Sequence, residues 1–97
     1  MTSKSIKELF QDFTDEYIKF ERVENKLSSR PDIHAFILLN ELCPGNRDIV
    51  SCAEHDEIWL DIDDDLLAKN ATDEQIKDLH RCGVRWDSHA GCLAMFV

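Results

Sequence analysis

Glycine, proline and long apolar runs are scarce in this chain of 97 residues, and each scarcity excludes a class of protein. Three glycines and two prolines are too few for a loop-dominated or low-complexity chain. No apolar run approaches the roughly 18 residues that a membrane-spanning helix needs. The first seven residues lack the apolar segment of a secretion signal, so we expect a cytoplasmic protein with no membrane partner.

Familiar catalytic motifs are also missing. The sequence contains no P-loop, no Gly-x-Gly-x-x-Gly, no Gly-x-Ser-x-Gly and no His-Glu-x-x-His. A chain this short also offers little room for a deep pocket. We therefore predict a protein that is not an enzyme, with no catalytic residue and no cofactor.

Basic residues are absent from residues 48–68, which contain eight acids and no lysine or arginine. Residues 1–47 have a net charge of −1 and residues 69–97 a net charge of zero, so this segment carries nearly all of the total of −9. A field of that sign repels nucleic acid and attracts basic protein surfaces. We expect a basic protein partner and no direct contact with nucleic acid.

The N-terminal half has the periodicity of helices. A capping box at Ser5–Glu8 precedes an apolar stripe that predicts one long amphipathic helix over roughly residues 5–27. The stripe contains Phe10, Phe13, Tyr17 and Phe20; its role in the core is the simpler interpretation, and a homodimer seam is the alternative. Residues 33–43 indicate a second helix, although so short an apolar run also fits a buried strand.

Two hairpins flank a helix in the C-terminal half. Residues 49–53 and 57–62 form the first predicted hairpin, and residues 84–86 and 92–97 form the second. Between them, Asp63 or Asp64 caps a short helix, and the capping box Thr72–Gln75 opens a longer one that ends before Gly83. The expected fold class is α+β: one domain spanning 1–97, with two N-terminal helices and then ββαββ, its antiparallel sheet covered by helices on one face.

The acidic segment supplies the candidate binding residues. Along residues 57–63 a period of two places Glu57, Trp59, Asp61 and Asp63 on the outer face, about 6.6–6.8 Å apart. Such a row of carboxylates resembles a row of phosphates, and a tryptophan among them would anchor a partner. The predicted partner-binding set is Glu54, Asp56, Glu57, Trp59, Asp61, Asp63, Asp64 and Asp65.

Metal binding is the rival interpretation. Cys52, His55, His89 and Cys92 form two pairs at the two predicted hairpin turns, and four such ligands could hold zinc if the turns converged. Buried thiols are the simpler interpretation of the cysteines, so we predict no metal site. Residues 61–65 begin like a calcium loop, but Leu66 and Thr72 stand where that loop needs glycine and glutamate.

Four C-terminal stretches carry a family resemblance: residues 55–61, 72–76, 81–87 and 93–97. Over this half the chain resembles small uncharacterised proteins of bacteriophages, prophages and plasmids. The resemblance implies a bacterial host cytoplasm and assigns no functional residue.

These observations together predict a small acidic, non-enzymatic protein-interaction module. A narrower hypothesis is a nucleic-acid mimic that inhibits a host nucleic-acid-binding protein, of the anti-CRISPR or anti-restriction type. The alternatives are a zinc-stabilised small domain and a dimeric structural or accessory phage protein.

Overall fold

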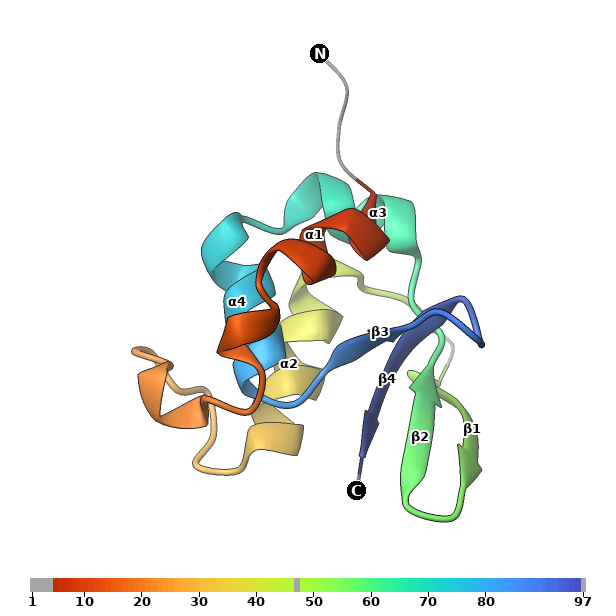
Figure 1. Ribbon diagram of the computed structural model, residues 1–97, viewed down its shortest axis with the longest axis horizontal. Coiled ribbons are helices and arrows are strands. Elements are labelled where there is room, and N and C mark those ends of the chain that lie inside the picture. The colour runs from red at the N-terminus through yellow and green to blue at the C-terminus, as the bar shows by residue number, and fades with distance from the viewer. Residues whose placement is uncertain (1–4, 47, 97) are drawn as a thin grey trace.

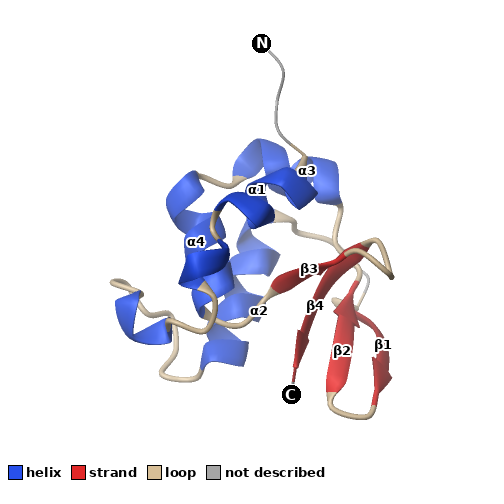
Figure 2. Cartoon of the chain, viewed as in Figure 1, coloured by secondary structure: helices blue, strands red, loops and turns tan. Residues whose placement is uncertain are grey.

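A helical layer and a small sheet make up the fold (Figures 1 and 2). The computed structural model describes residues 5–46 and 48–96. In chain order, the elements are α1 (Ile6–Asp12), the 3-10 turns η1 (Thr14–Glu16) and η2 (Phe20–Arg22), α2 (Pro31–Leu42), β1 (Val50–Glu54), β2 (Glu57–Leu60), α3 (Asp64–Asn70), α4 (Asp73–Arg81), β3 (Arg85–Asp87) and β4 (Cys92–Phe96).

The sheet has the strand order β1-β2-β4-β3, and every neighbouring pair is antiparallel. Leu60 pairs with Leu93, and both side chains lie in the core together with Met95. The helices lie on one side of the sheet, as Figure 2 shows, and leave its outermost strand, β1, exposed. The α+β class and the two flanking hairpins are therefore confirmed.

The prediction of a single long N-terminal helix is wrong. The helix ends at Asp12, two short 3-10 turns follow, and Ile18 adopts a φ of 55°, outside the helical region. The N–H of Ile18 donates instead to the carbonyl of His80 at the end of α4, 3.0 Å away. A straight helix over residues 5–27 would be about 34 Å long and would bring only one stripe to the core. The broken path lets this segment follow the helical layer of a domain that measures 38 × 29 × 26 Å.

Along this broken path, the aromatic side chains that were proposed as a dimer seam pack against the rest of the domain. Phe10 is buried, Phe13 and Phe20 pack against the core, and the ring of Tyr17 meets that of His80 edge-on at 6.3 Å. The described residues therefore present no continuous helical stripe of these four aromatics to solvent.

Local signals place the other elements well. Pro31 begins α2, which settles the choice between helix and strand in favour of helix. Asp63 caps α3, the Thr72–Gln75 capping box opens α4, and Gly83 follows α4 with a φ of 98°. β2 stops at Leu60, two residues earlier than expected. The expected end of the last strand at Val97 lies outside the described residues.

Candidate functional site

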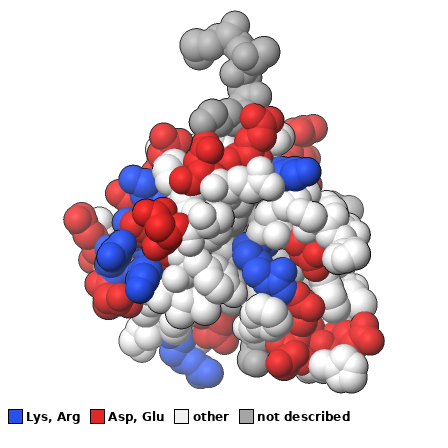
Figure 3. Space-filling model, in the orientation of Figure 1, with Lys and Arg blue, Asp and Glu red and all other residues white. Residues whose placement is uncertain are grey.

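The predicted binding residues lie at two ends of β2 and not on one continuous wall. Glu54 and Asp56 are exposed beside and within the β1–β2 turn, and acidic side chains are visible at the lower right of Figure 3, where that hairpin lies. The acids from Asp61 onward lie past the other end of the strand, in the connection to α3 and in its first turn. Only Glu57 and Trp59 lie on β2 itself.

The outer face of the sheet is not an unneutralised anionic surface. Arg85 on β3 forms an ion pair with Glu57, and its guanidinium lies 4.5 Å from the ring centroid of Phe96. Trp59 donates its indole N–H to Asp87 at 2.8 Å. That hydrogen bond is the main reason why the pKa of Asp87 is lowered. Glu57, a member of the predicted partner-binding set, is therefore already paired with a basic side chain, because Arg85 reaches it from β3 across β4.

The predicted alternation of acids also fails beyond Leu60. Asp63 accepts a hydrogen bond from the backbone N–H of Leu66 at 3.1 Å, so its carboxylate caps α3. Burial raises the pKa of Asp64, and its acidic neighbours Asp65, Asp63 and Asp61 act in the same direction. Asp63 thus belongs to a helix start rather than to a strand face, and Asp61 lies in the connection before it, where its backbone N–H donates to the Ile49 carbonyl at 2.6 Å.

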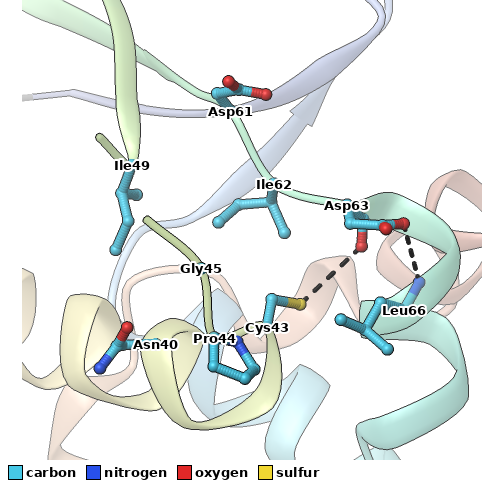
Figure 4. A pocket seen from close by; sticks show the side chains of 9 residues that line it. All are labelled: Asn40, Cys43, Pro44, Gly45, Ile49, Asp61, Ile62, Asp63 and Leu66. Carbon is cyan, nitrogen blue, oxygen red and sulfur yellow. Dashed lines mark hydrogen bonds between the residues drawn. The ribbon is translucent and has the colours of Figure 1, made fainter. Parts of the chain in front are cut away.

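A groove runs beside these acids. At one end, a pocket of about 160 Å³ lies between the end of α2 and the β2–α3 connection, as Figure 4 shows. Its lining residues are Asn40, Cys43, Pro44, Gly45, Ile49, Asp61, Ile62, Asp63 and Leu66. An open depression lined by Phe36, Asn40, Asp48, Ile49 and Val50 continues from it, since both share Asn40 and Ile49. The pocket thus mixes polar and apolar groups, with Asp61 and Asp63 in its lining, whereas the open depression is mainly apolar and includes Asp48.

Exposed apolar side chains extend this surface, and the sequence analysis missed them. Ile33 and Ile37 lie one turn apart on α2, and Val50 opens β1; all three are exposed. Their signal was visible in the sequence: α2 is apolar nearly all round, and a helix of that kind in so small a domain leaves part of its surface uncovered. We name the depression, the pocket in Figure 4 and these three residues the α2–β1 groove.

Cys43 in the groove, and Cys82 and Cys92 elsewhere in the domain, are poor nucleophiles. Burial, together with the negative charges of Asp63 and Asp64, raises the pKa of Cys43 to about 11; its S–H donates to the Asp63 carbonyl at 3.8 Å (Figure 4). Burial likewise raises the pKa of Cys82 to about 12 and that of Cys92 above its ordinary value. Because the thiolate is the reactive form, these three cysteines are mainly protonated at neutral pH.

The proposed zinc ligands do not converge. Glu57, which follows the first hairpin turn, pairs with Phe96, whereas Leu60 at the other end of β2 pairs with Leu93. The two turns therefore lie at opposite ends of the sheet, with His55 in one and His89 in the other. Within residues 5–46 and 48–96, no group of three or more histidine, cysteine, aspartate and glutamate side chains could hold a metal ion.

Two buried histidines give the domain a predicted pH dependence. Burial lowers the pKa of both His34 and His80. The Nε2 of His80 donates to the Phe10 carbonyl at 2.5 Å, and the Nδ1 of His34 accepts the Leu27 N–H at 3.0 Å. Nearby acids, Asp15 and Glu16 at His80 and Asp78 and Glu41 at His34, oppose this lowering, while Lys26 adds to it at His34.

The free energy of unfolding is expected to fall as pH drops from 7.5 to 5.5. The unfolded histidines bind protons near pH 6.5 and the folded ones only at lower pH, so each histidine contributes a slope of up to about 1.4 kcal/mol per pH unit. Urea unfolding at several pH values measures this slope. His34→Asn with His80→Gln, which retain the two hydrogen-bonding positions, should flatten it. The exposed pair His55→Gln and His89→Gln should leave it unchanged; an equal flattening there would refute the assignment.

Comparison of the chain with protein-family models, curated proteins and solved structures gives no match. None of the helices in the described part of the chain is long and apolar enough to cross a membrane.

Proposed function

We propose that the chain is a small, non-enzymatic protein-interaction module that binds a basic partner through the α2–β1 groove and the acids around it. One observation carries this proposal: a groove with apolar side chains lies between α2 and the segment of residues 48–68, which holds eight acids and no lysine or arginine. Asp48 lines the groove, and Glu54 and Asp56 extend the acidic surface to the hairpin tip.

The combination of apolar lining and acidic rim indicates the chemistry of the partner. Apolar side chains removed from water supply affinity, at about 25 cal/mol per Å² of buried area. The surrounding carboxylates raise the association rate of a basic partner and disfavour an acidic one. The outer face of the sheet is less suitable, because Arg85 already neutralises Glu57 there.

Nucleic-acid mimicry is the narrower form of this proposal. It requires that the basic partner be a nucleic-acid-binding protein of the host, in the bacterial cytoplasm that the resemblance implies. The acids do not form one evenly spaced row, so mimicry would depend on the overall field and not on a copied phosphate spacing. Duplex DNA that displaces captured proteins in a pull-down would support mimicry.

Removing charge beside the groove should weaken binding of a basic peptide. We expect the triple change Asp48→Asn, Glu54→Gln and Asp56→Asn to reduce the affinity for fluorescein-labelled octalysine about tenfold at an ionic strength of about 0.15 M, measured by anisotropy. The matched control, Asp15→Asn, Glu21→Gln and Glu24→Gln, removes the same charge from exposed positions in the N-terminal half. The control should change affinity by no more than about twofold, because screening confines exposed charges to short range. Equal losses in both variants would show a general charge effect and refute the site.

A further inference from the structure

The outermost strand of the sheet, β1, has an open edge. Within the described part of the chain, β2 is the one strand that pairs with β1, and all five residues of β1 are exposed. β1 stands at the right-hand margin of the fold in Figure 1. The opposite edge strand, β3, is only three residues long and α1 packs against it. A free edge of this kind is a template for another strand.

The pairing of β1 with β2 shows which backbone groups face outward. Successive residues of an antiparallel ladder turn their N–H and C=O alternately toward and away from the partner strand. Glu54 and Glu57 flank the two-residue turn directly, so they form the pair that closes the hairpin. The alternation then turns the N–H and C=O of Ala53 toward the free edge.

The two faces of β1 differ in chemistry. The register of β1 shifts at a bulge between Val50 and Cys52. Val50 and Ala53 therefore pair with Leu60 and Ile58, and both lie on the inner face, on the side of the α2–β1 groove. The helices leave both of them exposed. Cys52 and Glu54 lie on the outer face, opposite Trp59 and Glu57. A strand added to this edge would therefore meet an apolar surface on one face and a carboxylate on the other.

Charge selects the occupant of this edge. A second copy of the chain would bring a further net charge of −9 and its own acidic segment against the first. Like charges brought together in this way oppose association. A segment of a different protein that carries lysine or arginine is attracted by the same field.

We propose that β1 binds an extended segment of its partner as a fifth strand, in which apolar and basic residues alternate. The apolar row lies over Val50 and Ala53 toward the α2–β1 groove, and the basic row lies beside Glu54 on the outer face. Backbone hydrogen bonds at Ala53 hold the segment in register, as in other cases of strand addition. This inference rests on the proposed function and specifies the conformation and sequence pattern of the partner.

The test uses a labelled eight-residue peptide of alternating lysine and valine. The comparison peptides are a block peptide of four lysines and four valines, and the alternating peptide methylated on the backbone nitrogens of alternate residues, made in both phases. We expect the alternating peptide to bind at least about tenfold more tightly than the block peptide. One methylated phase should lose about tenfold, as expected when a buried carbonyl loses its donor.

Substitutions in the protein provide a second, independent test. Ala53→Pro removes the outward N–H, a change that an edge strand tolerates, and should weaken the alternating peptide about tenfold. Ala53→Ser retains the N–H and should stay within about twofold. Thermal unfolding of both variants checks the fold, and the methylated peptides give the same answer even if the proline variant unfolds.

The outcomes separate this inference from the proposed function. Suppose that the block and alternating peptides bind equally, and that the triple variant Asp48→Asn, Glu54→Gln and Asp56→Asn weakens the binding of both. Strand addition is then wrong and the acidic module stands. If neither peptide responds to that variant, the proposed function fails as well. A dimer in solution that Ala53→Pro dissociates would identify a second copy as the occupant and overturn the proposal.

Discussion

Replacing Phe10 with alanine is expected to lower the free energy of unfolding by about 3–5 kcal/mol, the usual cost of removing a buried phenylalanine. The side chain is 1% exposed, and its ring centroid lies 4.8 Å from that of His80. Urea unfolding measures the loss. Phe96→Ala is the matched control, because Phe96 is 55% exposed. We expect it to cost no more than about 1 kcal/mol, mainly from its contact with Arg85.

The same variant separates a core role from a dimer seam. If Phe10 belonged to an exposed seam, its removal would dissociate a dimer and leave the stability of the monomer nearly unchanged. The structure instead predicts that Phe10→Ala destabilises the chain equally at every protein concentration. A stability loss that disappears on dilution, together with a change of mass in solution, would contradict the burial of this residue.

Replacing Arg81 with methionine is expected to lower the free energy of unfolding by about 2 kcal/mol, because the carboxylates that the guanidinium now binds lose their partner. Arg81 is 11% exposed and donates to Glu16 at 2.6 Å and to Asp78 at 2.8 Å, and it reaches Glu74 at 3.3 Å. The hydrogen bond from Arg81 is the largest cause of the lowered pKa of Glu16. This cluster ties η1 to the end of α4.

Arg22 provides the control for this prediction. It binds the other carboxylate oxygen of Glu16 at 2.9 Å, but its side chain is 52% exposed. Exposed ion pairs contribute little, so Arg22→Met should cost less than about 1 kcal/mol. Urea unfolding of both variants measures the difference. Equal losses would mean that water screens the Arg81 cluster as fully as the Arg22 pair.

The helices and hairpins that depend on local chemistry could be predicted from the sequence. A capping side chain acts within three or four residues of its own position, so Ser5, Asp63 and Thr72 marked helix starts correctly. Gly83 marked a helix end for the same reason. The long N-terminal helix failed because its periodicity recorded which residues are apolar and not the path that buries them. The hydrogen bond from Ile18 to His80 spans 62 residues, beyond the reach of any local pattern.

The features of the candidate site likewise divide into those that the sequence predicts and those that only the tertiary structure decides. The sequence by itself determined where the negative charge lies along the chain and which short elements form, because charge and capping are properties of neighbouring residues. Only the tertiary structure decided that Arg85 neutralises Glu57, that the two hairpin turns lie at opposite ends of the sheet, and that a groove opens between α2 and β1. Each of these depends on strand order and on the packing of segments distant in sequence, which many compact arrangements of the same local elements could satisfy differently.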